Sequence, residues 1–223
     1  MPSSTVENYL KQLYLHRSPD EEQSVTMGRL AAAMGVVSGT ATAMVKALAD
    51  AGLVEYQPRA GVKLTPQGER LALHVLRRHR LVELFLVEQL GLDWAEVHDE
   101  AEALEHAVSD RVLERLDALL GHPAFDPHGD PIPGPHGQVP QPELVPLADC
   151  TVGGTYRVGR VLDQEPEFLN FAALNGLTPR AELRVERREV AAGTLTVRAG
   201  DRPAVSLSLA AAGQILVTPT NVG

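Results

Sequence analysis

The stretch of residues 26–65 reads TMGRLAAAMGVVSGTATAMVKALADAGLVEYQPRAGVKLT, and its pattern decides the fold of the N-terminal part of the chain. Residues 26–34 and 38–50 are expected to be two helices, because both are rich in helix formers and a short turn containing Gly35 separates them. Ser38 is a suitable N-cap for the second helix, and Gly52 is a stop just past its end.

The residues on either side of this pair complete a recognisable order of elements. Residues 53–56 and 62–65 flank QPRAG, which predicts a two-stranded hairpin with a basic tip. Upstream, residues 6–15 place Val6, Tyr9, Leu10, Leu13 and Tyr14 on one helical face, and a polar break follows at residues 18–22. Helix, turn, helix and hairpin in this order indicate a winged helix-turn-helix. The alternative is a small helical bundle whose hairpin contacts no nucleic acid.

The second helix of the pair begins with unusually small residues. Short side chains let a helix N-terminus approach phosphates and base edges. With so few long polar side chains, phosphate positioning and DNA shape are expected to matter more than bidentate base contacts. The residues expected to approach DNA are Ser38, Gly39, Thr40, Thr42 and Lys46 on the helix and Arg59 and Lys63 on the hairpin.

Downstream, the pattern changes twice. Residues 65–90 predict one long helix, and residues 94–120 predict a further helical block. Residues 122–146 hold eight of the sixteen prolines and are expected to be a linker or an extended arm. From residue 151 onward, apolar and polar residues alternate in five short segments separated by glycine-containing turns, which predicts a small β-barrel.

Composition narrows the function. The chain has 223 residues and a net charge of −9, but residues 1–80 carry ten Lys and Arg against seven Asp and Glu, so the acidic excess lies downstream. A basic N-terminal part with an acidic remainder fits a DNA-binding domain joined to a cation-binding one. The single cysteine, Cys150, excludes an internal disulfide. No apolar run is long enough to span a membrane, and no signal peptide is apparent. A cytoplasmic location without membrane contact is expected.

Residues 98–106 read HDEAEALEH and gather potential metal ligands. At 100° per residue, His98, Glu102, Glu105 and His106 fall within an arc of roughly 100°. Continued at the same pitch, the arc becomes leucine-rich and should face inward, unless Ser109-Asp110 starts a new helix. His79 and Glu83 form a similar pair on the preceding helix. Buried imidazoles and carboxylates need partners or a cation. The alternative is a charged helix surface with ordinary Glu/Arg pairing.

These donors are carboxylates and imidazoles, without a thiolate. Such a set favours Mn²⁺ or Fe²⁺ over the thiolate-rich sites that select Zn²⁺. Zn²⁺ would still bind tightly, and Zn²⁺, Co²⁺ or Cd²⁺ are expected to substitute in vitro. Manganese is therefore the expected physiological metal, with iron as the alternative.

Several strings carry a family resemblance. They include His79-Arg-Leu-Val-Glu83, His98-Asp-Glu-Ala101 followed by Glu105-His106, and Asp130-Pro-Ile-Pro-Gly134. The chain resembles the diphtheria toxin repressor family of metal-dependent regulators over nearly its whole length. Glu102 makes it similar to the manganese transport regulator branch, because the iron-responsive branch has cysteine at that position.

The resemblance implies an α+β fold with three domains. These are a winged helix-turn-helix over residues 1–65, a helical dimerisation and metal-binding domain over 66–121, and, after a proline-rich linker over 122–146, an SH3-like small β-barrel over 147–223. It implies a primary metal site of Glu102, Glu105 and His106 with a donor from the first helix. It also implies an ancillary site of His79, Glu83 and His98, to which the barrel adds Glu165 or, alternatively, Glu167.

Three residues depart from the family pattern. Asn8 stands where the family has methionine or aspartate, and its amide oxygen is the expected first-helix donor. Lys11 stands where the manganese branch has glutamate, and Phe168 replaces a second donor from the barrel. The number of ions and the metal selectivity therefore stay open at this point.

The function expected from all this is a homodimeric repressor that binds a palindromic, double-stranded operator when loaded with Mn²⁺, and that takes no small organic substrate. One alternative is a winged-helix regulator that senses an organic ligand. Another is a metal-dependent hydrolase, although the chain has no zincin motif, nucleophile elbow or phosphate-binding glycine loop.

Overall fold

The computed structural model describes residues 3–17 and 24–220. The polar break predicted at residues 18–22 lies outside the described residues. The chain packs as two compact units. The first holds the described residues up to 79 together with 104–109 and 133–139, and the second holds 80–103, 110–132 and the described residues from 140 onward.

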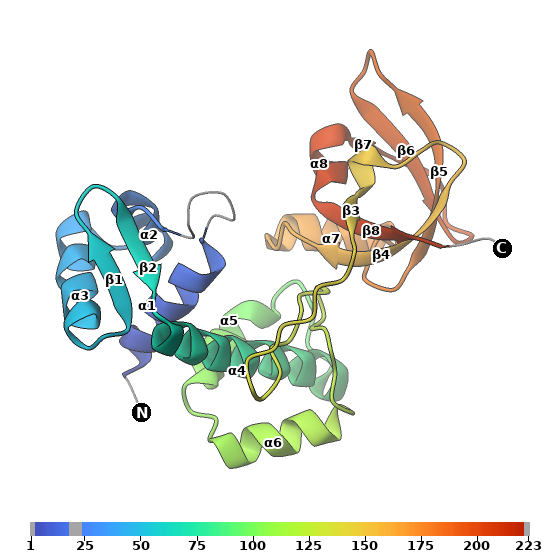
Figure 1. Cartoon of the computed structure of the whole chain (residues 1–223). Helices are drawn as coiled ribbons and strands as arrows, with labels where there is room; N and C mark the ends of the chain where they lie inside the picture. The colour runs from blue at the N-terminus through green and yellow to red at the C-terminus, as the bar shows by residue number, and fades with distance from the viewer. Residues whose placement is uncertain (1–2, 18–23, 221–223) are drawn as a thin grey trace. The chain divides into compact units, whose positions relative to one another are not determined.

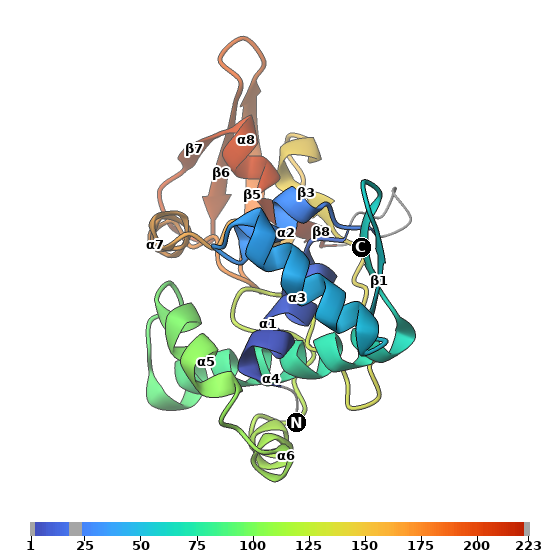
Figure 2. The same ribbon diagram turned by 90° about the vertical axis from the view of Figure 1, so that its left-hand side faces the viewer.

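The first unit begins with three helices and a hairpin (Figure 1). The helices are α1 (Ser4–Leu15), α2 (Met27–Ala33) and α3 (Ser38–Asp50), and the strands are β1 (Val54–Gln57) and β2 (Gly61–Leu64). The chain bends by 103° between α2 and α3, and Figure 2 shows the two helices at this steep angle. This is the winged helix-turn-helix that the sequence predicts.

The ends of α3 are partly as expected. Gly52 adopts the positive φ of 71° that ends a helix, as predicted. The prediction that Ser38 is the N-cap is wrong, because Val37 occupies that position in an extended conformation without a side-chain cap. Ser38 is already helical, and its carbonyl accepts a hydrogen bond of 2.7 Å from the Thr42 hydroxyl.

The hairpin packs on the helices as the wing. β1 and β2 pair antiparallel from Val54–Leu64 to Gln57–Gly61, and Val25 adds a bridge to Val62. Arg59 takes a positive φ of 72° at the tip. The core beneath consists of Tyr9, Leu10, Leu13, Val25, Leu30, Ala31, Ala41, Val45, Leu48, Leu53, Val54, Val62 and Ala72.

A single long helix follows the wing. α4 (Pro66–Leu90) begins after Thr65, whose hydroxyl accepts the N–H of Gly68. It runs without a break across the border between the two units, which falls between His79 and Arg80. The middle of this helix therefore contributes side chains to both units.

The predicted helical block of residues 94–120 is two helices. α5 (Val97–Glu105) ends at the ligand-rich segment, and α6 (Asp110–Leu119) starts again with an acidic residue in its first turn. The N–H of Ala107 turns back to the carbonyl of Leu104, and Asp110 suits a helix N-terminus electrostatically. The alternative that Ser109-Asp110 starts a new helix is confirmed. The inward face therefore does not continue at the same pitch, and Val112 is exposed.

The C-terminal part is one antiparallel sheet of the second unit, in the order β3-β8-β4-β5-β6-β7. Its strands are β3 (Val145–Pro146), β4 (Thr155–Val161), β5 (Glu182–Glu189), β6 (Thr194–Ala199), β7 (Val205–Ser208) and β8 (Ile215–Pro219). A 3-10 turn (Leu147–Asp149) and two helices not foreseen from sequence, α7 (Pro166–Leu174) and α8 (Leu209–Gly213), complete it. β4 and β5 each carry a register shift, after Val158 and Val185.

No single described helix is long and apolar enough to cross a membrane. Only the bent pair α2 and α3 has enough length and apolar character when its two helices are counted together.

Gly68 provides a test of the packing at the start of α4. A Cβ here would overlap the carbonyl oxygen of Leu53, which is backbone and cannot rotate away. Gly68→Ala should therefore lower the free energy of unfolding by about 1–3 kcal/mol, measured by denaturant titration. The matched control is Gly28→Ala in α2, where a Cβ meets nothing within 4 Å; it should stabilise by about 0.5–1 kcal/mol. Equal effects of the two substitutions would contradict this packing.

Candidate metal centre

The middle of α4 buries an unusual number of polar side chains: Arg77, Arg78, His79, Arg80 and Glu83. Helix geometry brings His79 and Glu83, one turn apart, to the same side. Buried charges are tolerated only when they are paired or bind ions, so their partners define the chemistry of this region.

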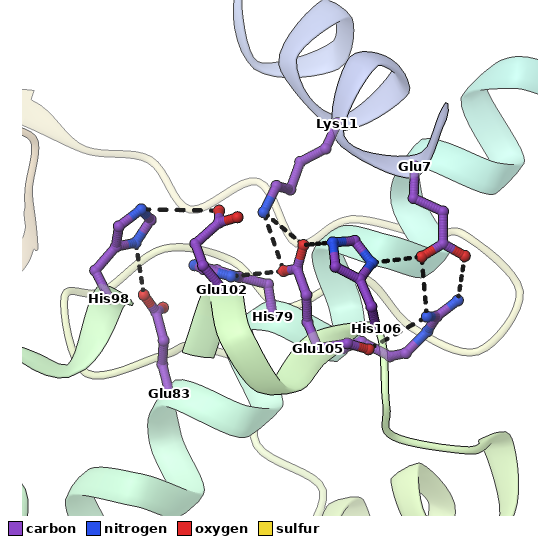
Figure 3. Close-up of polar contacts among 9 residues, drawn as sticks. Glu7, Lys11, His79, Glu83, His98, Glu102, Glu105 and His106 are labelled. Atoms are coloured by element: carbon purple, nitrogen blue, oxygen red, sulfur yellow. Dashed lines mark hydrogen bonds and ion pairs between the residues drawn. The ribbon is translucent and has the colours of Figure 1, made fainter. Parts of the chain in front are cut away.

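Glu105, the last residue of α5, is the most buried of these partners. It is 0% exposed, and both of its carboxylate oxygens accept hydrogen bonds from Lys11 Nζ, at 2.8 and 3.0 Å. His79 Nδ1 lies 2.7 Å from Glu105 Oε2. Burial alone would raise the pKa of Glu105, but the contacts with His79 and Lys11 outweigh it and leave the pKa below its usual value. Figure 3 shows Lys11 reaching from α1 to this carboxylate.

Glu7, one turn before Lys11 on α1, fixes the neighbouring His106. Its Oε2 lies 2.7 Å from His106 Nδ1, and the Arg78 guanidinium binds its two oxygens at 3.2 and 3.3 Å. A carboxylate oxygen accepts a hydrogen bond, so Nδ1 is the donor and carries the hydrogen. His106 Nε2 then carries the lone pair. It is buried 3.3 Å from Glu105 Oε1 and has no hydrogen-bond partner.

Asn8 was the first-helix donor expected from sequence. Its Oδ1 is buried and also has no hydrogen-bond partner. Sequence reasoning missed Glu7, which lies beside it and supplies the contact with His106. The available signal was the spacing of Glu7 and Lys11, because residues four apart share a helical face.

A second group of donors lies around Glu83. Its Oε1 is 3.2 Å from His98 Nδ1, and His98 Nε2 is 3.8 Å from Glu102 Oε1 (Figure 3). Glu83 is buried, whereas the His98 side chain is 54% exposed and Glu102 is half-buried. The group therefore has a buried carboxylate on α4 and a solvent-accessible imidazole on α5.

The predicted ligands divide between the two units. His79, Glu105 and His106 belong to the first, and Glu83, His98 and Glu102 belong to the second. Within the first unit His79 contacts Glu105, and within the second His98 contacts Glu83. The role of these residues as metal ligands stays a prediction.

The three residues of the sheet domain lie near the start of α7. Glu165 and Glu167 are exposed there, and Phe168 packs against Phe171 with the ring centroids 6.2 Å apart. A role of either glutamate as a ligand stays a prediction.

Cys150 is buried in the same domain, and burial raises the pKa of its thiol.

The residues predicted to approach DNA lie on α3 and the wing. Ser38, Gly39, Thr40 and Lys46 are exposed along α3, and Arg59 is exposed at the hairpin tip. Thr42 and Lys63 are half-buried. The N-terminal half of α3 therefore exposes small side chains, and the positive charge of Lys46 lies farther along the same helix.

Three family models together match most of the chain. Residues 1–62 match "Iron dependent repressor, N-terminal DNA binding domain", residues 65–134 match "Iron dependent repressor, metal binding and dimerisation domain", and residues 145–219 match the FeoA domain.

Individual relatives agree with these matches. The iron-dependent repressor IdeR of Mycobacterium leprae is 31% identical over 196 residues, which cover 82% of this chain and 84% of the relative. The diphtheria toxin repressor of Corynebacterium efficiens is 38% identical over 131 residues, 58% of this chain and 56% of that protein.

A solved structure described as a manganese-dependent transcriptional repressor in complex with manganese superimposes with a TM-score of 0.84 at 44% identity. The match covers 96% of this chain and 100% of that one. The family models, the relatives and this structure agree with the fold described above. The chain belongs to the diphtheria toxin repressor family of metal-dependent transcriptional regulators.

Proposed function

We propose that this protein is a homodimeric repressor that binds a palindromic operator when loaded with Mn²⁺, with Fe²⁺ as the alternative activator. The observation that carries the proposal is the contact of α1 with the buried carboxylate of Glu105 and the half-buried imidazole of His106. α1 belongs to the winged helix-turn-helix, so a ligand held at this point acts directly on the DNA-binding domain. The family is one of transcriptional repressors, which leaves no support for the hydrolase alternative.

Glu102, Glu105, His106 and Asn8 would hold the primary ion. Two features fit a cation: the buried lone pair of His106 Nε2 and the unpartnered Asn8 Oδ1. Glu7 acts behind the site, because it holds His106 in the tautomer that presents Nε2. Lys11 competes for Glu105, so the carboxylate must exchange an ammonium for the ion. This exchange weakens the site relative to one without lysine and ties binding of the ion to the position of α1.

His79, Glu83 and His98 would hold the ancillary ion, with Glu165 or Glu167 as the donor from the sheet domain. The exposed ring of His98 gives solvent access, and the buried Glu83 supplies charge. A bound ion would supply positive charge to the carboxylate of Glu83.

The donor set supports manganese as the activating metal. It consists of carboxylates, imidazoles and one amide, and the buried Cys150 lies in the sheet domain rather than with them. Hard oxygen-rich sites suit Mn²⁺ and Fe²⁺, whereas Zn²⁺, Co²⁺ and Cd²⁺ can occupy the same donors in vitro. The relative of known structure that is 44% identical is described in complex with manganese.

DNA binding is assigned to α3 and the wing. Small residues at the start of α3 allow close approach of the helix N-terminus to phosphates, and Lys46, Arg59 and Lys63 supply the positive charge. In a two-fold dimer, the spacing of two recognition helices must match two half-sites. Donors that join α1 to the helical domain would favour the conformation with that spacing, which is a population shift.

A second candidate function is supported by one observation. The second unit contains a largely apolar cavity of about 630 Å³, whose lining includes Leu84, Trp94, Phe125, Leu144 and Val158. A cavity of this size suits an organic ligand. The two functions are separated by operator binding in a buffer with controlled chelator: a metal-activated repressor loses affinity when Mn²⁺ is removed, whereas a sensor of organic ligands does not.

His106→Ala should abolish the gain in operator affinity with Mn²⁺ and leave the dimer folded. The substitution removes the lone-pair donor, and Glu7 keeps Arg78 as a partner. Metal affinity should fall by about 100-fold or more, measured by titration calorimetry, with melting temperatures recorded with and without Mn²⁺. His122→Ala, at an exposed histidine, is the control. A variant that still gains stability and affinity from Mn²⁺ would remove His106 from the site.

Glu102→Cys should move the metal preference from Mn²⁺ toward Fe²⁺, Co²⁺ or Zn²⁺, because a thiolate replaces a hard oxygen donor. The measurement is operator binding during titration with each metal. Glu100→Cys places a thiol on the exposed side of the same helix and should leave the order of metals unchanged. An identical order for the parent and Glu102→Cys would refute the role of Glu102.

Lys46→Ala and Lys63→Ala should each weaken binding about equally across DNA sequences. Each should also reduce the slope of log K against log salt by about 0.9, the value for one phosphate contact. The control is Arg187→Ala, at an exposed arginine of β5. A lysine whose removal leaves the slope unaltered does not contact a phosphate.

A further inference from the structure

The cavity of about 630 Å³ in the second unit is bordered by segments that are far apart in the sequence. Leu84 and Val87 come from α4, Trp94 follows that helix, and Leu144 and Val158 come from the chain at the sheet. Protein interiors are packed so closely that few voids exceed the size of a water molecule. A space of this volume falls within the range of about 300–1,000 Å³ that is typical of small-molecule sites. Its walls and its charges therefore define which molecule fits it.

Backbone contacts fix two walls of this cavity. A Cβ at Gly129 would overlap the carbonyl of Gly159 on β4, and a Cβ at Gly159 would overlap the Leu144 side chain. Both glycines line the cavity. Gly129 also has a φ of 85°, a conformation that L side chains rarely adopt. Because the segment at residue 129 and β4 are already in contact, the cavity cannot shrink by moving these two walls together.

Polar side chains border the cavity along β4 and the loop after α7. Arg157 lies on β4 and faces Thr218 of β8 in the register of the sheet. The N–H of Arg180 donates to the carbonyl of Val158 at 2.8 Å, which brings its backbone beside that of β4. Arg157, Arg180 and Thr218 all line the cavity, as does Thr178. Two guanidiniums and two hydroxyls therefore lie on the wall that the sheet forms.

Arg180 combines an unusual backbone conformation with an unpaired charge. Its φ is 73°, in the left-handed region that residues other than glycine adopt only at a cost. Its side chain is exposed and makes no hydrogen bond or ion pair with any residue in the described ranges 3–17 and 24–220. Arg157 is paired with Glu182 at 2.7 Å, but both side chains are more than half exposed. An ion pair so open to water exchanges its partners at little cost.

The negative groups of the lining lie on other walls. Glu88 is exposed on α4, and Asp126 is buried in the segment before residue 129. Asp126 Oδ1 already accepts two backbone N–H groups of its own turn, both at 2.9 Å. An anionic group in the cavity is therefore attracted to Arg157 and Arg180 and repelled by Glu88, which directs it to the wall that the sheet forms.

We propose that this cavity binds an organic carboxylate with an aliphatic chain, and that the carboxylate pairs with Arg180 and Arg157. Guanidinium and carboxylate form charge-assisted, often bidentate hydrogen bonds. The chain lies against the apolar side chains of Leu84, Val87 and Trp94. The proposal rests on the second candidate function, because it names the class of ligand for the same cavity. It uses none of the residues proposed to bind Mn²⁺.

Trp94 makes binding observable, because it lines the cavity and is the only tryptophan of the chain. The experiment titrates the full-length protein with decanoate, decanol and decylamine, which share one chain length and differ in charge. The titrations are done in chelator and without DNA, and they record Trp94 emission and the heat of binding. Decanoate should bind at one molecule per chain and about tenfold more tightly than decanol, because the alcohol forms no charged hydrogen bond with a guanidinium. Decylamine should bind more weakly than decanoate, since its ammonium meets two guanidiniums.

Two variants sharpen the test. Arg180→Gln should weaken the binding of decanoate by about tenfold and leave that of decanol unchanged. The matched control is Arg184→Gln, at an exposed arginine of β5 outside the cavity lining, which should bind decanoate as the parent does. Ala173→Phe adds a ring at the cavity wall and should weaken the binding of both decanoate and decanol. The melting temperature in chelator establishes that each variant is folded, and Arg180→Gln carries the test if Ala173→Phe does not fold.

Equal affinities of the parent for decanoate and decanol would overturn the proposal. Tighter binding of decylamine would also overturn it, because the cavity would then select a cation through Glu88. An unchanged affinity of Arg180→Gln for decanoate, or the absence of saturable binding in the parent, has the same consequence. Because metal and DNA are left out, failure of the Mn²⁺-dependent repressor function is a separate result. If decanoate binds as expected but leaves operator affinity unaltered, the site stands and the second candidate function is refuted.

Discussion

The buried carboxylate of Glu105 is the constraint on which the arrangement of the first unit depends. A carboxylate withdrawn completely from water needs compensating charge, because the cost of an unpaired buried ion is several kcal/mol. Lys11 from α1 and His79 from α4 provide it, at 2.8 and 2.7 Å. The pairing therefore fixes where the DNA-binding domain meets the end of α5, and any change in the partners of Glu105 acts on α1.

The same constraint explains why the region can respond to a cation. Lysine and a divalent ion are alternative partners for one carboxylate, so under the proposed function an ion bound to Glu105 would displace Lys11 and release this link to α1. Glu7 adds a second link, since it joins α1 to both Arg78 and His106. The N-terminal helix is thus joined to residues 105 and 106 by two ionic contacts. Binding of a metal in place of these contacts would rearrange them. Such a bistable contact is what a ligand-driven shift of populations needs.

Farther along α4, the turn at residues 126–130 brings Asp126 close to Glu83, and the guanidiniums of Arg80 and Arg160 lie beside the two aspartates of the turn. His128 Nδ1 is buried in the same turn without a hydrogen-bond partner. Apolar packing of the sheet and the hairpin accounts for the stability of both ends of the chain. The charged middle is organised instead by ion pairs, and it holds the candidate metal ligands.

The sequence by itself determined the order and type of the main elements. Local preferences of the backbone are visible in the repeating apolar patterns, in Gly52 and in the alternation after residue 151. These features predict the winged helix-turn-helix, α4 and the strands. The string of residues 98–106 with His79 and Glu83 predicted the candidate donors, because their spacing is set within single helices. The break between α5 and α6 was not resolved, since 106–109 can continue a helix until packing decides otherwise.

The tertiary structure alone decided which donors face one another. Glu7, Lys11, Asp126 and His128 lie far from Glu105 or Glu83 along the chain, and no periodicity connects them. Their roles follow from burial, which forces each charged group to find a partner wherever the fold brings one within reach. Local patterns determine elements because backbone geometry is local, whereas pairing of buried charge depends on distances that exist only after the elements have packed.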